Sequence, residues 1–216
     1  FLRDVFVPLM AGGTICIPPQ DEEFFVPEKL TAWIDKCRIN LIHCVPSLFR
    51  AINNPSLPPD NFRHLHYILL SGEKIIPSEL INWYNVFKDR IELVNLYGTT
   101  ETTMIRTFYR IRPQDVTQAS ISIGGPIDDT ELLIAKKDFK PCNTLVPGEL
   151  YIISDYITKG YLNAPAHNQE RFVTITTGLH AGKRAFKTGD IARRLPDGRI
   201  ELLGRTDRQI KLRGIR

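Results

Sequence analysis

The densest group of side chains that could bind a nucleotide lies at residues 95–103, where the sequence reads NLYGTTETT. Tyr97 offers a flat ring for a base, Gly98 lets the backbone approach a ligand, and the threonine hydroxyls can donate hydrogen bonds to phosphate oxygens. Glu101 could bind Mg²⁺, which favours a carboxylate together with phosphate oxygens. The threonines could instead cap their own turn through hydroxyl-to-backbone hydrogen bonds. The residue types alone leave both interpretations open.

Two groups further along the chain could serve the same chemistry. Thr188-Gly189-Asp190 places a carboxylate on a predicted tight turn, where Asp190 could accept hydrogen bonds from both hydroxyls of a ribose; an Asx turn explains the tripeptide equally well. Residues 204–214 belong to a basic cluster near the end of the sequence. This cluster suits a nucleotide phosphate or an acidic surface, and a solvated basic edge strand is the alternative.

The elements that must position these groups follow from hydrophobic periodicity. Between residues 1 and 105, strand-like runs alternate with helical stripes that begin near prolines. We predict strands at 14–17, 41–45, 67–70 and 91–94, and helices that open near Pro27, Pro46 and Pro77. Strands separated by helices of this length form βαβ units and a parallel sheet. Ligands collect beyond the carboxyl ends of such strands, where His43, Ser71-Gly72-Glu73 and residues 95–103 lie.

After Arg106 the pattern changes to short strand-like runs separated by turn residues. We predict strands at 130–135, 149–153, 183–187, 191–194 and 199–203, with a tight turn at Pro196-Asp197-Gly198 between the last two. These runs predict a second, mainly β lobe. The predicted division is therefore 1–125 for the α/β part, 126–203 for the β-rich part and 204–216 for a terminal segment.

The composition limits the classes of partner. The 216 residues carry 28 basic and 24 acidic side chains, a net charge of +4, which is too small and too evenly spread to indicate a nucleic-acid partner. No apolar run approaches the roughly 18 residues that a membrane helix needs, and no leader peptide is visible. Four widely spaced cysteines fit free thiols in a reducing cytoplasm. Residues 1–8 form an apolar segment that we expect to be packed, as at an internal cut.

The order and spacing of four motifs carry more information than any one of them. The sequence has NLYGTTETT at 95–103, GELYIISDYITKGYL at 148–162, FKTGD at 186–190 and GRTDRQIKLRGIR at 204–216, with IGGPI at 123–127. Together they resemble the signature motifs of the adenylation domains of nonribosomal peptide synthetases, whose superfamily includes acyl-CoA synthetases and luciferases. The resemblance implies an α/β fold: the parallel-sheet βαβ portion of the large adenylate-forming core, followed by a mainly β lobe, with the small C-terminal lobe absent.

The resemblance also implies roles for residues in these motifs. Asn95 and Tyr97 would frame the adenine, and Asp190 would hold the ribose hydroxyls with Arg205 nearby. The catalytic residues would be Thr100, at the α-phosphate, and Glu101, which would bind Mg²⁺. The glycines that would let the backbone approach the nucleotide are Gly72 and Gly98. Asp207 matches the hinge about which the small lobe swings.

The reaction that the resemblance implies has two steps. The carboxylate of an amino acid attacks the α-phosphate of ATP to give an aminoacyl-adenylate and pyrophosphate, and the phosphopantetheine thiol of a peptidyl carrier protein then displaces AMP. A condensation domain of the same assembly line would be a further partner. An acyl- or aryl-CoA ligase and a non-catalytic nucleotide-binding remnant are the alternatives. The QIKLRG run at 209–214 favours the peptide-synthetase form, and the presence of Glu101, Asp190 and Arg205 argues against a remnant.

The sequence departs from the family pattern at several places. Thr99 stands where the family often has proline, and Ser154-Asp155 stands where it usually has glycine. We expect the phosphate-binding loop and the aspartate that grips the substrate amino group to lie upstream of Phe1, and the lysine of the small lobe to lie beyond Arg216. On this basis the 216 residues alone should not complete the first step efficiently.

The resemblance finally nominates a pocket for the amino-acid side chain, formed by Arg3, His43, Leu69, Ser71, Leu96, Met104 and Ile105. An arginine in an otherwise apolar cavity is costly unless an anion or a carbonyl group meets it. Arg3 with His43 therefore indicates a substrate that bears a carboxylate, such as aspartate, glutamate or a methylated relative. Alternatively, Arg3 pairs with Asp4, His43 is a satisfied core histidine, and the substrate is a neutral polar amino acid.

Overall fold

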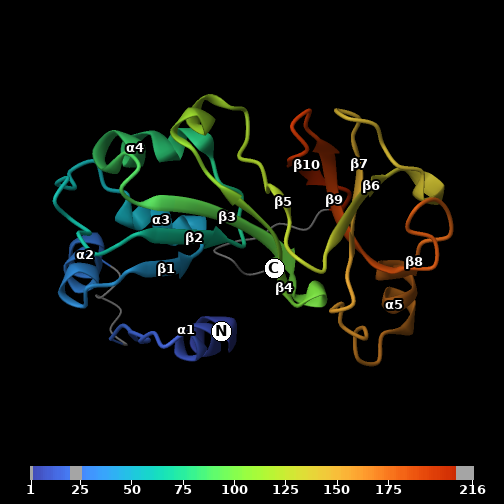
Figure 1. Cartoon of the computed structure of the whole chain (residues 1–216), viewed down its shortest axis with the longest axis horizontal. Helices are drawn as coiled ribbons and strands as arrows, with labels where there is room; N and C mark the ends of the chain where they lie inside the picture. The colour runs from blue at the N-terminus through green and yellow to red at the C-terminus, as the bar shows by residue number, and fades with distance from the viewer. Residues whose placement is uncertain (1, 20–25, 208–216) are drawn as a thin grey trace.

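The computed structural model describes residues 2–19 and 26–207, which form two sheets joined along one edge (Figure 1). Sheet A has the strand order β1-β2-β3-β4-β5, in which β1, β2 and β3 are parallel and the last two are antiparallel. Its strands are β1 (Leu41–Cys44), β2 (Tyr67–Ser71), β3 (Glu92–Thr99), β4 (Met104–Arg110) and β5 (Gly125–Pro126). The prediction of βαβ units around a parallel sheet is confirmed for β1 to β3.

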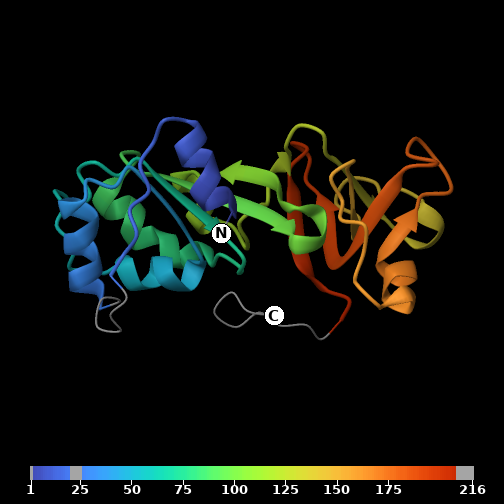
Figure 2. The same ribbon diagram turned by 90° about the horizontal axis from the view of Figure 1, so that it is seen from below.

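Helices cover both faces of sheet A. Figure 2 shows α3 and α4 on one face and α1 on the other. Four of the helical segments begin with proline at the first turn, where its missing N–H costs no intrahelical bond. The helices of this part are α1 (Leu2–Met10), α2 (Pro27–Lys36), α3 (Pro46–Ile52) and α4 (Ile81–Phe87), with 3-10 turns η2 (Pro77–Leu80), η3 (Thr100–Thr102) and η4 (Pro113–Thr117).

An aromatic cluster forms the core beneath sheet A. The Trp83 side chain is fully buried, and its ring lies 4.5 Å from the Phe87 ring and 5.1 Å from that of Phe49. The Phe62 ring stacks on Trp83 with a centroid distance of 5.9 Å. Aromatic pairs of this geometry stabilise a core beyond the area that they bury. The cluster therefore anchors α3 and α4 against the strands.

Sheet B forms the second, mainly β lobe, as predicted. Its strand order is β10-β9-β7-β6, all antiparallel, and β8 pairs with β9. Its elements are β6 (Glu131–Ala135), η5 (Lys137–Phe139), β7 (Gly148–Ile153), α5 (Pro165–Arg171), β8 (Phe172–Thr174), β9 (Arg184–Arg194) and β10 (Ile200–Arg205). The domain boundaries at residues 125 and 203 stay predictions.

Backbone hydrogen bonds join the two lobes. Ile123 N donates to Ile200 O at 2.9 Å, and Ile200 N donates to Gly124 O at 2.9 Å. Gly124 has φ +77°, and a Cβ there would lie 1.9 Å from the carbonyl oxygen of Phe108. Arg199 adds a side-chain contact, donating to the Tyr109 hydroxyl at 2.6 Å. The junction therefore requires a glycine and fixes β10 against sheet A.

Several sequence predictions about elements were wrong. Residues 14–17 form no strand, because no neighbouring strand in the described ranges pairs with this short run. The apolar segment at residues 2–10 is the helix α1, and none of its side chains is buried. The strand predicted at 91–94 continues as β3 to Thr99, and β4 and α5 were not predicted. The runs at 183–187 and 191–194 form the single strand β9.

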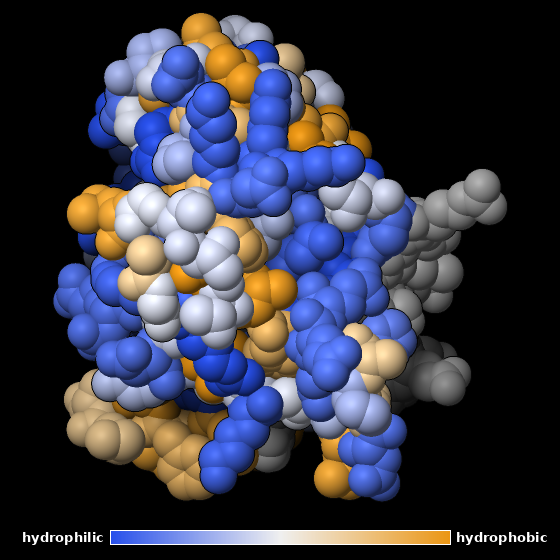
Figure 3. Space-filling model, turned by 90° about the vertical axis from the view of Figure 1, so that its right-hand side faces the viewer, coloured by the Kyte–Doolittle hydropathy of each residue, from blue (hydrophilic) through white to orange (hydrophobic). Residues whose placement is uncertain are grey.

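The described part of the chain contains no helix that is long and apolar enough to cross a membrane. The surface on the side of sheet B is mostly hydrophilic (Figure 3). The most exposed apolar side chains of this lobe are those of Leu162 and Leu179.

Candidate active site

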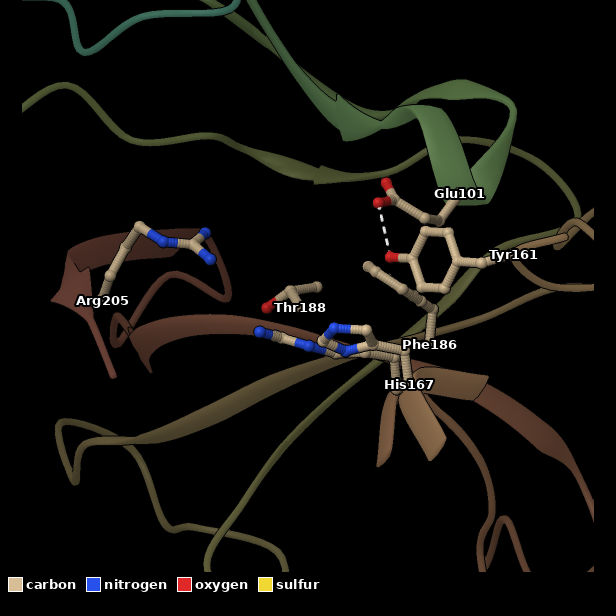
Figure 4. Close-up of a pocket in the computed structure, with 7 residues that line it drawn as sticks. Glu101, Tyr161, His167, Phe186, Thr188 and Arg205 are labelled. Atoms are coloured by element: carbon tan, nitrogen blue, oxygen red, sulfur yellow. Dashed lines mark hydrogen bonds between the residues drawn. The ribbon is translucent and has the colours of Figure 1, made fainter. Parts of the chain in front are cut away.

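A cavity of about 270 Å³ lies where η3 of the first lobe faces α5, β9 and β10 of the second (Figure 4). Glu101 closes it on the side of sheet A. The residues that line the cavity are Glu101, Tyr161, His167, Arg171, Phe186, Thr188 and Arg205. Carboxylate, hydroxyl, imidazole and guanidinium groups thus converge on one space, which suits a polar, anionic ligand.

The Glu101 carboxylate is held from the second lobe. Glu101 is only 5% exposed, and its Oε1 accepts a hydrogen bond from the Tyr161 hydroxyl at 2.7 Å. Its backbone oxygen accepts a bond from Thr158 N at 2.8 Å. The η3 turn that carries Glu101 also caps itself, since Thr102 Oγ1 donates to Thr99 O at 3.1 Å. The self-capping turn is therefore present, and Glu101 nevertheless lines the cavity.

A chain of charged hydrogen bonds runs beside the cavity. The Tyr97 hydroxyl donates to Asp190 Oδ2 at 2.5 Å, and Arg205 donates to Asp190 Oδ1 at 2.7 Å. Arg205 also donates to both oxygens of Asp207, at 2.7 and 2.8 Å, and Arg171 donates to Asp207 at 3.1 Å. Each carboxylate oxygen has a second lone pair. Asp190 can therefore accept further bonds while it stays oriented.

Burial, and then the negative charge of Asp190, raise the pKa of Tyr97 well above its usual value. The hydroxyl therefore stays protonated and remains a donor. The hydrogen bonds to Asp207 first, and the charge of Asp190 next, raise the pKa of Arg205. Thr188-Gly189-Asp190 lies inside β9, which corrects the prediction of a tight turn between two strands. Gly189 has φ +77°, a conformation that side chains other than glycine rarely adopt.

Four other residues predicted at the nucleotide do not line the cavity. Asn95 is buried in β3, and its amide donates to Ser122 O at 2.8 Å, which ties β3 to the segment that leads into β5. Gly72, with φ +90°, directly follows β2. A Cβ on Gly98 would lie 1.6 Å from Met104 O, because β3 and β4 are in close contact there. Thr100 is exposed at the start of η3.

The residues predicted for the side-chain pocket lie on neighbouring strands of sheet A and on α1. Strand pairing sets His43 beside Leu69 and Ser71 beside Leu96. Beyond them, β3 and β4 bring the other two members close, since Gly98 pairs with Ile105 and Thr99 with Met104. Helix α1 places Arg3 against this surface. The structure therefore groups all seven predicted pocket residues around β1 to β4 and α1.

Arg3, Asp4, His43 and Ser71 form one hydrogen-bonded cluster. Arg3 donates to Asp4 Oδ1 at 2.9 Å and lies 2.7 Å from His43 Nδ1. His43 Nδ1 lies 2.9 Å from Asp4 Oδ1, and Nε2 lies 2.8 Å from Ser71 Oγ. Nδ1 of a neutral ring can donate to Asp4 or accept from Arg3, and when Nδ1 donates to Asp4, Nε2 accepts from Ser71. Burial, and then the charge of Arg3, lower the pKa of His43, which keeps the ring neutral.

A family model described as AMP-binding enzyme matches residues 1–162. The chain belongs to this family. Tyrocidine synthase 3 of Brevibacillus parabrevis is 38% identical over 216 residues, which are 100% of this chain and 3% of the synthase. Surfactin synthase subunit 2 of Bacillus subtilis (strain 168) is 36% identical over 98% of the chain and 6% of that subunit. The chain thus spans a small part of the length of these relatives.

Solved structures of nonribosomal peptide synthetases share the fold. The nonribosomal peptide synthetase FmoA3, in its α-methyl-L-serine-AMP bound form, has a TM-score of 0.85 and 31% identity over 96% of this chain and 23% of its own. An NRPS protein containing adenylation and PCP domains has a TM-score of 0.78 and 28% identity over 87% of this chain and 32% of its own. The resemblance to nonribosomal peptide synthetase adenylation domains, predicted from the four motifs, is confirmed.

The side chains that line the cavity of this AMP-binding enzyme fit a divalent cation that is bound together with the phosphates of a nucleotide. Within residues 2–19 and 26–207, no three His, Cys, Asp or Glu side chains lie together as a metal cage. Mg²⁺ at phosphate sites commonly uses one or two carboxylates together with phosphate oxygens and water. Glu101, a buried carboxylate that lines the cavity, matches that mode of binding.

Sequence reasoning missed several residues that line the cavity. Tyr161, Phe186 and Thr188 lie within quoted motifs, yet nothing in their spacing assigned them to the site. His167 and Arg171 belong to α5, whose start at Pro165 was an available signal, since proline is favoured in the first turn of a helix.

Proposed function

We propose that this chain is the amino-acid-activating part of a nonribosomal peptide synthetase. It binds ATP and an amino acid, forms the aminoacyl-adenylate, and releases pyrophosphate. The observation that carries this proposal is the buried Glu101 carboxylate in the cavity beside the Asp190–Arg205 pair. The structural similarity to FmoA3 in its α-methyl-L-serine-AMP bound form supports it.

In the proposed reaction, a carboxylate oxygen of the amino acid attacks the α-phosphorus of ATP, and the bond from that phosphorus to the pyrophosphate oxygen breaks. Glu101 would hold Mg²⁺, which would neutralise charge on the phosphates. The Thr100 hydroxyl would donate to the α-phosphate, and Asp190 would accept the ribose hydroxyls. Tyr97 and Asn95 would border the adenine, with Gly72 and Gly98 close to the nucleotide. The catalytic contribution of these residues is positioning and electrostatic stabilisation.

In the second half of the proposed reaction, the aminoacyl group passes to the phosphopantetheine thiol of a peptidyl carrier protein. The thiolate sulfur attacks the acyl carbon, and AMP leaves. Asp207 is proposed as the hinge that allows a small lobe to change position between the two steps. A condensation domain would then use the loaded carrier. A CoA ligase would load free coenzyme A instead, so loading of a carrier protein against loading of coenzyme A distinguishes the two functions.

For the substrate, an amino acid with a side-chain carboxylate remains our first candidate. Arg3 would offer it a donor from one side of the pocket, with His43 beside Arg3. The second candidate, a neutral polar amino acid, is supported by the contact of Arg3 with Asp4 at 2.9 Å, because Asp4 already supplies the anion that Arg3 needs. Ser71 and His43 would then meet a hydroxyl or amide of the substrate.

ATP–pyrophosphate exchange by the full-length protein, measured for every proteinogenic amino acid, tests both the proposed activation of an amino acid and the proposed class of amino acid. We expect exchange that requires Mg²⁺ and one class of amino acid. Glu101→Gln should lower kcat/KM by about 100-fold or more, as loss of one group that stabilises transition-state charge commonly does. Glu28→Gln, an exposed carboxylate on α2, is the matched control and should change nothing. Absence of exchange with any amino acid would overturn the proposed function; exchange only with a large neutral residue would overturn the acidic substrate alone.

A further inference from the structure

Arg106 is a buried cation for which neither the motifs nor the reaction supplies a role. It lies on β4 and is 4% exposed. Its guanidinium donates to neutral oxygens: Nε to Thr102 O at 2.5 Å, one terminal nitrogen to Thr130 Oγ1 at 3.4 Å, and the other to Tyr156 O at 3.4 Å. Burial lowers its pKa. Burying a charged side chain costs free energy. The hydrogen bonds of Arg106 must therefore hold together segments that an apolar side chain at this position would not hold together.

Apart from Thr130, the acceptors of Arg106 belong to two segments that meet at the cavity. Thr102 directly follows Glu101 in η3, whereas Tyr156 lies in the segment between β7 and α5. The guanidinium also lies over the Tyr156 ring, 5.6 Å from its centroid. Arg106 therefore holds the η3 turn, which carries Glu101, against the segment that carries Tyr161.

Three other hydrogen bonds connect the same two segments. Thr103 Oγ1, which accepts a short bond from Arg106, lies 3.1 Å from Tyr156 O and 2.8 Å from Thr102 O, so its one hydrogen is shared between these two carbonyls. Thr158 N donates to the Glu101 backbone oxygen at 2.8 Å. The Tyr161 hydroxyl then donates to the Glu101 carboxylate at 2.7 Å. These hydrogen bonds form a continuous series from the Arg106 guanidinium to the Glu101 carboxylate. A displacement of Tyr156 would therefore also displace Tyr161, which lies five residues later in the chain.

We propose that Arg106 is a positioning residue for the Glu101 carboxylate. It holds η3 against residues 156–161, and through this contact Tyr161 fixes the orientation of the carboxylate toward a metal-bound nucleotide. The inference rests on the proposed function and deepens it. Misplacement of a catalytic group by about 1 Å can cost about 100-fold in rate, which is why a positioning residue outside the cavity matters.

The test compares variants of the full-length protein in ATP binding and in exchange. The variants are Arg106→Lys, which keeps the charge and loses the fork of donors, Tyr161→Phe, which keeps the ring, and their double variant. Arg110→Lys is the matched control, because Arg110 lies four residues along β4 and its side chain is 67% exposed. Calorimetry gives the Kd for ATP with Mg²⁺ and with EDTA, and exchange gives kcat and KM over a range of Mg²⁺ concentrations.

We expect each single variant to reduce the gain in ATP affinity that Mg²⁺ provides by about three- to tenfold, the value of one or two hydrogen bonds, with Kd in EDTA nearly unchanged. The double variant should lose no more than the larger single variant, because both act on the same carboxylate. Arg110→Lys should resemble the wild type. If Arg106→Lys fails to fold, Thr103→Ala removes the exposed link in the same chain of bonds and should give a smaller shift in the same direction.

Two results would overturn the inference. One is a gain in ATP affinity from Mg²⁺ that is unchanged in Arg106→Lys or Thr103→Ala while the Tm is lower, which would make the role of Arg106 structural only. The other is multiplication of the single effects in the double variant. Absence of exchange in the wild type would instead refute the proposed function, and the ATP-binding comparison would still decide the role of Arg106.

Discussion

Replacing Gly98 by alanine tests the close contact between β3 and β4. A Cβ at this position would lie 1.6 Å from Met104 O and 2.9 Å from Ile105 Cα, whereas real Cβ contacts stay beyond 3.0 Å. One strand must therefore move by about 1.4 Å, and backbone atoms cannot yield as a flexible side chain would. Because Met104 and Ile105 belong to the predicted substrate pocket, the displacement enters the site directly.

We expect two consequences of Gly98→Ala. Overpacking of this kind costs about 1–3 kcal/mol of stability, which should shorten the half-life of thermal inactivation of the full-length protein. A displacement larger than 1 Å beside the reacting groups should lower kcat/KM in ATP–pyrophosphate exchange by about 100-fold. The loss should appear in kcat and in the KM for the amino acid, since Met104 and Ile105 face the substrate in the proposed function.

Gly125→Ala is the matched control for this experiment. Gly125 lies in β5 of the same sheet, and a Cβ there would have no atom within 4 Å. The control should stay within about 0.5 kcal/mol of the wild type and keep its exchange activity. Equal behaviour of the two alanine variants would refute the argument that the β3–β4 contact shapes the site.

Three further predictions concern separate parts of the molecule. Asp190→Asn removes the charge that Arg205 meets at 2.7 Å and should raise the KM for ATP about 10- to 100-fold, whereas Asp60→Asn, at an exposed carboxylate, should not. The pKa of His43 in the folded protein is below 6.5, so its contribution to stability is present above pH 6.5 and is lost as the pH falls below that value. The Tm should therefore fall more between about pH 7.5 and 5.5 in the wild type than in His43→Gln. Equal dependence of the Tm on pH in the two proteins would contradict this prediction. Trp83→Ala should cost about 3–5 kcal/mol, and Trp83→Phe much less, because Trp83 Nε1 has no hydrogen-bond partner among the described residues; denaturant unfolding that ranks the two variants equally would contradict the packing argument.

Local signals in the sequence were sufficient for much of the scaffold. The stripe formed by Leu30, Trp33 and Ile34 after Pro27 predicted α2, and the apolar runs at 41–45 and 67–70 predicted β1 and β2. These predictions succeeded because hydrophobic periodicity and a proline in the first turn depend only on residues that are near one another in the sequence. Residue types at 188–190 and the family resemblance, rather than periodicity, directed attention to the second lobe as part of the same site.

The contacts that complete the site could not be predicted from local signals. Glu101 and Tyr161 are 60 residues apart, and their hydrogen bond depends on how the two lobes meet. Arg106 is satisfied by backbone and hydroxyl oxygens, which no pattern of residue types identifies as acceptors. The exposure of α1 is a further example, since an apolar stripe predicts a buried face without saying what covers it.

The junction between the lobes has a consequence for protein engineering. All seven predicted specificity residues lie at or before Ile105, so a chimera that exchanges this segment would appear to transfer substrate choice as a unit. The same segment carries Asn95 and Tyr97, whose partners Ser122 and Asp190 would come from the recipient protein. A functional crossover therefore has to match these two pairs as well as the pocket, and compatible donors can be chosen by checking them before any loop is redesigned.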